Sequence, residues 1–286
     1  MPKPKPNKHV FSIPKSILFT GKALQFIAPK LAARFAFKLF VTPFKFKRPN
    51  RESSMYQDAV KKMLLIPKLN KHIQVYRYGT SDKKILLIHG WAGRGTQLFK
   101  IAENLREKGY ETISFDATAH GDSEGKTSAM PEFIASMFEI EKEFGPFDHA
   151  IGHSLGGMAL LNAVKDGMQF KNIVIVGSGN SITGICNQFV HRLGLKQKVA
   201  DLLKNRLDWV LGQDSEVLSG YVAAQSVNIP TFVLHDMNDD DVPVSCAYEI
   251  RQNLVNSKIK ITEGLGHRRI LTNPEVIDEM ISFFEN

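Results

Sequence analysis

A serine at position 154 stands where a nucleophile would be expected. It is the centre of GHSLG at residues 152–156, and a further glycine follows. A buried-strand pattern precedes the serine at 149–152 and a helical pattern follows at 156–165, so the motif lies in a strand–turn–helix context. A hydroxyl at such a helix N-terminus is placed where developing negative charge is favoured. The pattern therefore predicts nucleophilic attack by Ser154.

A serine nucleophile requires a general base, and the base requires an acid that orients it. Downstream of Ser154, the sequence HDMNDDDVP follows one predicted strand and the sequence GLGH follows the last one. The second sequence supplies His267 as the base. The order Ser, Asp, His along the chain is one that triads in this context use. The first sequence supplies four candidate acids, which are Asp236, Asp239, Asp240 and Asp241.

Four short sequences in a fixed order resemble motifs of the α/β-hydrolase superfamily. The likeness extends from about residue 70 to residue 286. The four are HGWAG at 89–93, GHSLGG at 152–157, HDMNDDDVP at 235–243 and GLGH at 264–267. This resemblance to the serine esterases of the superfamily implies an α/β fold, in which a mostly parallel, doubly wound sheet carries a helical cap insertion.

The resemblance also implies catalytic roles, residue by residue. Ser154 corresponds to the nucleophile and His267 to the base. Asp239 corresponds to the acid, because it takes the spaced position in the family's H-D-x-x-D-x-x-V-P pattern. Some relatives place the acid after the sixth strand instead, but residues 177–181 contain no carboxylate, which favours Asp239.

An oxyanion hole and a reaction follow from the same resemblance. The backbone N–H groups of Trp91 and Leu155 would hold the oxyanion that forms when Ser154 attacks a carbonyl. We expect a serine hydrolase that cleaves a carboxylic ester in a small-molecule acyl substrate, without a cofactor or a metal. The alternatives are a thioesterase, a serine peptidase or amidase on the same triad, and a catalytically silent hydrolase-like binding protein.

Several other polar side chains have ordinary structural interpretations. We expect His89 to brace its own loop through a hydrogen bond, and His153 to point away from the nucleophile. His120 and Asp122 are close in sequence, but no second pair of ligands at zinc spacing accompanies them. These patterns give no reason to expect a metal site.

The composition and the hydrophobic pattern describe the scaffold that must position these residues. The chain has 286 residues, 43% of them hydrophobic and 23% charged, which is typical of a globular protein. Continuous apolar runs alternate with amphipathic helical stretches, as in a parallel sheet covered on both faces. Strands are expected at 72–78, where the sheet would open, and at 84–89, 112–115, 149–152, 173–176, 231–235 and 258–262. Helices are expected near 97–108, 130–144, 156–165 and 274–284.

Two segments depart from this alternation. Residues 181–228 lie between two predicted strands and have a mainly helical pattern, far longer than a single crossover helix needs. We therefore expect a helical cap insertion there, within a hydrolase domain at 51–286. Residues 1–50 form the second departure, a basic segment that contains eleven lysines and arginines and no acidic residue.

The basic segment accounts for the net charge of +8, since the remainder of the chain sums to −3. A nucleic-acid role for the main body therefore has little support. Residues 1–10 are rich in proline and lysine and are expected to be extended or disordered. A helical pattern covers 15–41 and is broken at Pro29.

The second half of this helical pattern is amphipathic. Its basic residues recur every four positions, and an apolar row lies beside them. The residues concerned are Lys30, Arg34 and Lys38 in the basic stripe, and Leu31, Phe35, Phe37, Leu39 and Phe40 in the apolar surface. Two interpretations stay open, peripheral contact with an anionic membrane through residues 15–41 and packing on the hydrolase domain. No apolar run is long enough to span a membrane and no secretory signal is evident, so a cytoplasmic location is expected. The oligomeric state is not indicated.

Overall fold

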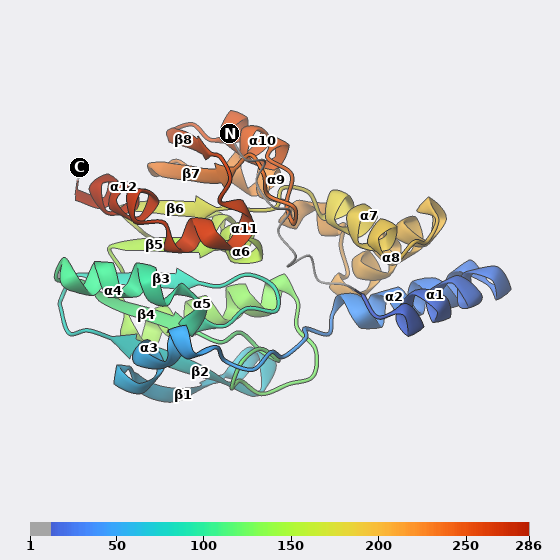
Figure 1. Cartoon of the computed structure of the whole chain (residues 1–286), viewed down its shortest axis with the longest axis horizontal. Helices are drawn as coiled ribbons and strands as arrows, with labels where there is room; N and C mark the ends of the chain where they lie inside the picture. Colours follow the sequence, from blue (N-terminus) through green and yellow to red (C-terminus); the bar gives the residue numbers. More distant parts are fainter. Residues whose placement is uncertain (1–12, 286) are drawn as a thin grey trace, which may run out of the picture.

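A computed structural model describes residues 13–285, and the prediction for residues 1–10 therefore falls outside the described part. Eight strands form one sheet in the order β1-β2-β4-β3-β5-β6-β7-β8 (Figure 1). Strands β1 and β2 pair antiparallel with each other, and β2 pairs antiparallel with β4; the other pairs are parallel. The strands are β1 (Val60–Ile66), β2 (Lys71–Tyr78), β3 (Lys84–Ile88), β4 (Glu111–Phe115), β5 (His149–His153), β6 (Asn172–Val176), β7 (Thr231–Asp236) and β8 (Ser257–Thr262).

Helices cover both faces of the sheet, so the mostly parallel α/β fold predicted from the sequence is confirmed. Neighbouring residues of a strand point to opposite faces, and on β3 Ile85 and Leu87 join one hydrophobic core while Leu86 and Ile88 join the other. The first core lies beneath α3 (Ser53–Asp58), α4 (Phe99–Glu107) and α12 (Pro274–Glu285). The second lies beneath α5 (Met130–Phe144), α6 (Leu155–Lys165) and α10 (Ser245–Asn253).

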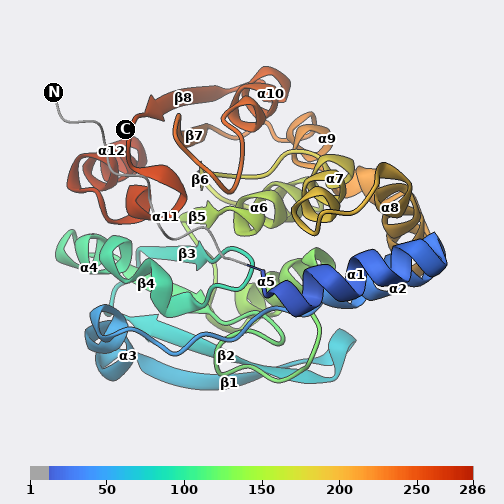
Figure 2. The same ribbon diagram turned by 45° about the vertical axis from the view of Figure 1, so that its right-hand side comes forward.

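A cluster of helices lies beyond the sheet at one side of the molecule (Figures 1 and 2). It contains two helices of the segment between β6 and β7, α7 (Ile182–Arg192) and α8 (Gln197–Leu211), and the N-terminal helices α1 (Lys15–Ile27) and α2 (Pro29–Phe40). The short α9 (Gly220–Ala224) returns the chain toward β7. Because α7 follows the carboxyl end of β6 directly, this cluster stands at the edge where parallel strands end.

The structure corrects one expectation about the sheet. Residues 72–78 do not open it, because β1 precedes them and pairs antiparallel with β2 at the sheet edge. Strand β1 was not predicted, because it is an edge strand whose apolar side chains, including Met63 and Leu65, are largely exposed. The short α10 and α11 (Gly266–Arg269) were also not anticipated.

Candidate active site

Ser154 lies in a tight turn between β5 and α6. Its backbone has φ 55° and ψ −121°, in a region that residues other than glycine seldom occupy. Such strain persists only where the surroundings enforce it. At Gly156 an added Cβ would lie 2.5 Å from the carbonyl oxygen of Ile88, so α6 can approach β3 only because this position is glycine. The turn therefore holds Ser154 at the carboxyl edge of the sheet, beside the N-terminus of α6.

Asp239, in the loop that follows β7, and His267, in the short α11 that follows β8, meet at the same edge. The Nδ1–H of His267 donates a hydrogen bond to Oδ2 of Asp239 at 2.7 Å. The other oxygen, Oδ1, accepts hydrogen bonds from the backbone N–H groups of Asp241 and Val242, both at 2.8 Å. This arrangement fixes the carboxylate and leaves Nε2 of His267 as the ring nitrogen that can accept a proton.

The electrostatics of Asp239 favour its charged form. Its side chain is only 1% exposed, and burial by itself would raise the pKa of the carboxyl group. The hydrogen bond and charge of His267, together with the two backbone donors, outweigh burial and hold the pKa of Asp239 below its usual value. The carboxylate is thus ionised at neutral pH, as an acid that orients a histidine must be.

The backbone of β6 connects Ser154 to this pair. The N–H of Ser154 donates to the carbonyl oxygen of Val176 at 2.8 Å. At the next residue, Gly177, an added Cβ would lie 3.2 Å from Nδ1 of His267 and 3.4 Å from Oδ2 of Asp239. The three residues singled out from the sequence therefore lie around the end of β6.

The other aspartates of the same loop have different contacts. Asp236 accepts hydrogen bonds from Thr262 Oγ1 at 2.7 Å and from the N–H of Leu265 at 3.0 Å, so it fastens the turn that carries His267. Asp241 lies 3.4 Å from Arg268 in an ion pair. Asp240 is exposed to solvent. Asp239 is the aspartate of this group whose carboxylate reaches His267.

His153 contacts the backbone and the ring of His267. Its Nε2–H donates to the backbone carbonyl oxygen of His267 at 2.9 Å, and the two rings are 4.6 Å apart. Burial, followed by the proximity of His267, lowers the pKa of His153 to about 3, so this ring is neutral. This contact was not predicted, because it involves a backbone atom that no motif encodes. His153 acts as a neutral support beneath His267.

Two backbone segments meet at Ser154. Leu155 begins α6, and Trp91 lies in the loop that follows β3. Trp91 follows Gly90, where an added Cβ would lie 2.7 Å from the Cβ of Ser154, so the chain passes directly over the serine. His89 braces this loop as expected, since Nδ1–H donates to Gly90 O at 2.7 Å and Nε2 accepts from the N–H of Ala117 at 3.0 Å.

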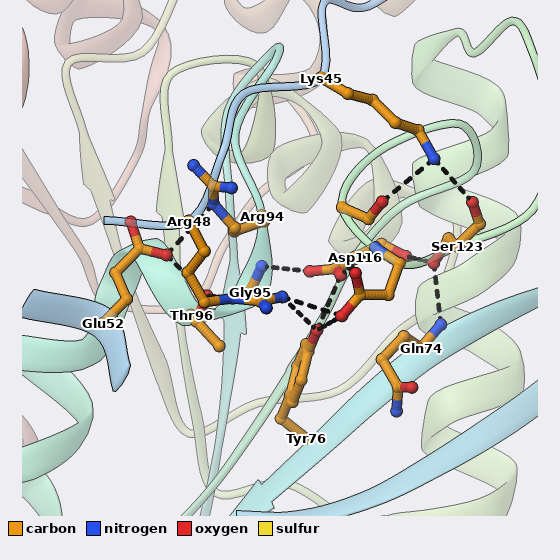
Figure 3. Close-up of polar contacts among 12 residues, drawn as sticks. Lys45, Arg48, Glu52, Gln74, Tyr76, Arg94, Gly95, Thr96, Asp116 and Ser123 are labelled. Atoms are coloured by element: carbon orange, nitrogen blue, oxygen red, sulfur yellow. Dashed lines mark hydrogen bonds and ion pairs between the residues drawn. The ribbon is translucent and has the colours of Figure 1, made fainter. Parts of the chain in front are cut away.

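A buried polar network contacts Gly95, four residues after Trp91 in the same loop (Figure 3). Its centre is Asp116, which accepts hydrogen bonds from Gly95 N–H, Tyr76 OH and Asp122 N–H, each at 2.8 Å. Burial raises the pKa of Asp116, although these donors act in the opposite direction. The network joins β2, the loop after β3 and the loop after β4.

The segment that links α2 to α3 completes this network from outside the sheet (Figure 3). Glu52, which is 1% exposed, accepts a hydrogen bond from Thr96 Oγ1 at 2.7 Å and pairs with Arg94 at 3.1 Å. Arg48 donates to Asp122 at 2.9 Å, and Lys45 Nζ donates to the carbonyl oxygen of Gly121 at 3.0 Å. We call residues 41–52 the N-terminal strap.

No sequence motif predicts these contacts. Glu52, Arg48 and Lys45 lie 42 to 76 positions from the partners named above, and no motif links them. The signal that was available is the DATAHGDSEG run after β4, which contains Asp116 and Asp122. No group of three or more His, Cys, Asp or Glu side chains between residues 13 and 285 is arranged to hold a metal ion.

Comparison with known proteins shows which protein family the sequence matches. A model of the alpha/beta hydrolase family matches residues 85–279. A non-heme haloperoxidase from Rhodococcus erythropolis is 22% identical over 263 residues, which cover 74% of this chain and 95% of that protein.

Solved structures show the same fold at low sequence identity. An esterase from Exiguobacterium antarcticum is 15% identical, with a TM-score of 0.62 over 79% of this chain and all of that one. A membrane phospholipase A described as a bacterial virulence factor is also 15% identical, with a TM-score of 0.63 over 95% of this chain and 96% of that one.

Proposed function

The chain belongs to the alpha/beta hydrolase family, and from that premise we propose that it is a serine hydrolase that cleaves carboxylic esters through an acyl-enzyme. One observation carries the proposal. The hydrogen-bonded pair of Asp239 and His267 stands at the end of β6, beside the strained turn that presents Ser154.

The proposed reaction has two halves. Ser154 Oγ attacks the acyl carbonyl carbon while Nε2 of His267 takes the hydroxyl proton, and Asp239 stabilises the resulting imidazolium. The N–H groups of Trp91 and Leu155 hold the oxyanion, each contributing on the order of 3 kcal/mol in the transition state. The imidazolium then protonates the departing alcohol. Water repeats the attack on the acyl-enzyme, which releases the acid and restores Ser154.

An ester is the favoured substrate class for two reasons. An esterase and a phospholipase A, whose names both denote ester cleavage, are among the proteins of similar fold. A serine at position 154 also disfavours the dehalogenase and epoxide-hydrolase chemistries of this superfamily, in which the nucleophile is an aspartate. A thioester, an amide or a silent site are the other outcomes that the experiment must separate.

We propose that the helical segment at 181–228 is a cap that selects the substrate. Helices α7 and α8 stand beyond the carboxyl edge of the sheet, and buried apolar residues on both helices join the second hydrophobic core. An apolar cover of this kind favours acyl chains longer than acetyl. Deleting α7 and α8 is expected to weaken the preference among acyl chain lengths, and an unchanged preference in a folded protein would contradict a selective cap.

A fluorophosphonate probe and a substrate screen test the proposal. The probe should label the wild-type chain and fail to label Ser154→Ala, with Ser178→Ala as a matched control at a neighbouring buried serine. Labelling of Ser154→Ala at the wild-type level would contradict the assignment. The screen compares p-nitrophenyl esters of increasing acyl length with acyl-CoA thioesters and aminoacyl anilides. The best substrate class distinguishes an esterase from a thioesterase or a peptidase, and turnover of none indicates a silent site.

A further inference from the structure

The two N-terminal helices have opposite relations to the rest of the molecule. Helix α2 is part of the folded body, because Ala32, Ala33 and Ala36 are buried against the second core. Phe40 extends the contact by meeting Phe189 of α7 edge to face, with ring centroids 5.2 Å apart. Of the apolar residues that the sequence singled out on α2, Phe37, Leu39 and Phe40 pack against this core, whereas Leu31 is 39% exposed.

Helix α1 buries one face and leaves large apolar side chains on the other. Gly21 is buried, and an added Cβ there would lie 3.4 Å from Leu195 and 3.7 Å from Phe35 of α2. On the opposite face, Phe19 is 76% exposed and Phe26 is 93% exposed. These two residues are seven apart, so they lie on the same side of the helix, and Ile27 beside them is 71% exposed. The outer face of α1 therefore presents an apolar row to solvent.

Basic side chains border this row and continue along α2. Lys15 and Lys22 lie on the exposed side of α1, and Lys30, Arg34 and Lys38 recur every four residues on the exposed side of α2. Neither helix contains an acidic residue. Within the part of the chain that the structure describes, none of these five cations forms an ion pair. We call the exposed side chains of residues 15–38 the outer face.

The combination of features selects one kind of partner. The phosphate backbone of a nucleic acid duplex offers no apolar environment to exposed phenylalanines, and a row of unpaired cations is costly against an apolar protein surface. An anionic bilayer satisfies both, since apolar rings enter the acyl boundary while lysine and arginine remain at the phosphates. No helix within residues 13–285 is long and apolar enough to cross a membrane. The helix would therefore lie along the interface.

We propose that the outer face of α1 and α2 docks the protein onto anionic lipid bilayers. Phe19 and Phe26 enter the acyl boundary, and the five cations contact lipid phosphates. The same helix pair lies beside α8 and α7 at the carboxyl edge of the sheet (Figure 2), so docking brings the edge that carries Ser154 close to the lipid. The inference goes beyond the proposed function, because binding to lipid does not require hydrolysis.

Cosedimentation with vesicles tests the proposal on the full chain. The probes are vesicles of phosphatidylcholine alone and of phosphatidylcholine with 30% phosphatidylglycerol, at low and at high salt. We expect binding to the anionic vesicles only, and a marked loss at high salt. Ser154→Ala should bind equally, which separates this result from any failure of the hydrolase proposal. Absence of binding to anionic vesicles at low salt would overturn the inference.

Variants on the outer face make the test specific. Phe19→Ser with Phe26→Ser should weaken partitioning at least about tenfold, because two exposed rings no longer enter the bilayer. Lys15→Gln with Lys22→Gln should weaken it about fivefold per cation and reduce its salt dependence. Two matched controls lie outside the outer face. Val255, which is 76% exposed, is replaced in Val255→Ser, and two exposed lysines are replaced in Lys83→Gln with Lys108→Gln. Both variants should bind vesicles as the wild type does.

Two further measurements keep the outcome decisive. Thermal unfolding of each variant shows whether the fold is intact, as expected for exposed positions. Sedimentation velocity without lipid shows whether the outer face instead joins two copies of the chain. A dimer that is dissociated by Phe19→Ser with Phe26→Ser, combined with equal vesicle binding by wild type and variant, would assign the face to self-association and overturn the proposal.

Discussion

The two sides of the candidate site are held together in different ways. On the side of the proposed acid and base, which we call the acid–base side, the loops after β7 and β8 hold the carboxylates, since Asp239 accepts from backbone donors three or fewer residues away and Asp236 accepts from the turn that carries His267. On the side of the proposed oxyanion hole, which we call the oxyanion side, the loop of Trp91 is held by residues of the N-terminal strap, including Glu52 and Arg48. The two carboxylates are thus held within their own loops, although Arg192 of α7 also contacts the loop after β7, whereas the oxyanion side depends on a segment that precedes the sheet.

The pKa shifts of buried groups also differ between the two sides. The carboxylates of Asp236 and Asp239 have lowered pKa values, because hydrogen-bond donors surround them and outweigh burial, so this side keeps its charge. On the oxyanion side, burial lowers the pKa values of His89 and His120 and raises that of Asp116. Burial thus dominates at these three groups, as it also does at His153 and His235, whereas hydrogen bonding dominates at Asp236 and Asp239.

The largest expected effect is on the acid–base side. Asp239→Asn should lower kcat by about a thousandfold to ten-thousandfold, because an amide in place of the carboxylate favours the wrong tautomer of His267 and does not stabilise the imidazolium. The lowered pKa of Asp239 means that the wild-type carboxylate is ionised throughout the assay range, so the loss should persist from pH 5 to pH 9. Asp240→Asn, an exposed neighbour, is the control and should retain near wild-type kcat. The reverse pattern would show that the acid is misassigned.

This contrast also explains which parts were predictable from the sequence. The elements near Ser154 were expected within one or two residues, because apolar runs and glycine spacing report burial and turns directly. The pairing of Asp239 with His267 could be proposed because family spacing carries it. Edge strand β1 was missed, since exposed Met63 and Leu65 gave no alternating pattern.

The oxyanion side was predictable only in part. HGWAG marks the loop itself, and the bracing role of His89 was expected from it. The strap was invisible, because Glu52 and Arg48 lie in a charged stretch that resembles ordinary solvent-exposed sequence. Only the folded chain shows that Glu52 is buried beneath Arg94 and Thr96. Long-range polar contacts depend on tertiary position, which hydrophobic periodicity does not encode.

A pH titration of stability tests the neutral character of the oxyanion side. Burial lowers the pKa of His120 to about 4, although its hydrogen bond to Thr118 O acts the other way. The unfolded histidine has a pKa of ~6.5, so between about pH 4 and 6.5 the unfolded state binds the extra proton. The contribution of His120 is therefore present above pH 6.5 and is lost as the pH falls toward 4, on the order of 3 kcal/mol.

Chemical denaturation across this range measures the effect. His120→Asn, which removes the titrating ring, should reduce the slope of unfolding free energy against pH between 4 and 6.5. His191→Asn, which replaces an exposed histidine of α7, is the control. Parallel curves for wild type and His120→Asn would mean that His120 is not held neutral by the fold.

The smallest expected effect concerns the strap. Glu52→Gln keeps the size of the side chain and an acceptor for Thr96 Oγ1, but it removes the charge that pairs with Arg94. Arg94 lies three residues after Trp91, so the oxyanion loop should lose rigidity. We expect kcat on the best ester to fall about tenfold, roughly 1.4 kcal/mol, with KM nearly unchanged, because the oxyanion contact forms only in the transition state.

A variant at a surface carboxylate is the control for the loss of one negative charge in Glu52→Gln. Glu143→Gln removes the partner of Lys62 in an exposed ion pair on α5, and such pairs contribute little, so kcat should stay at the wild-type level. Thermal unfolding identifies any Glu52→Gln protein that is merely less folded, since unfolding lowers the active fraction without changing kcat per active site titrated by the fluorophosphonate probe. An unchanged kcat per titrated site would show that the oxyanion side, like the acid–base side, maintains its own geometry and that the strap only covers it.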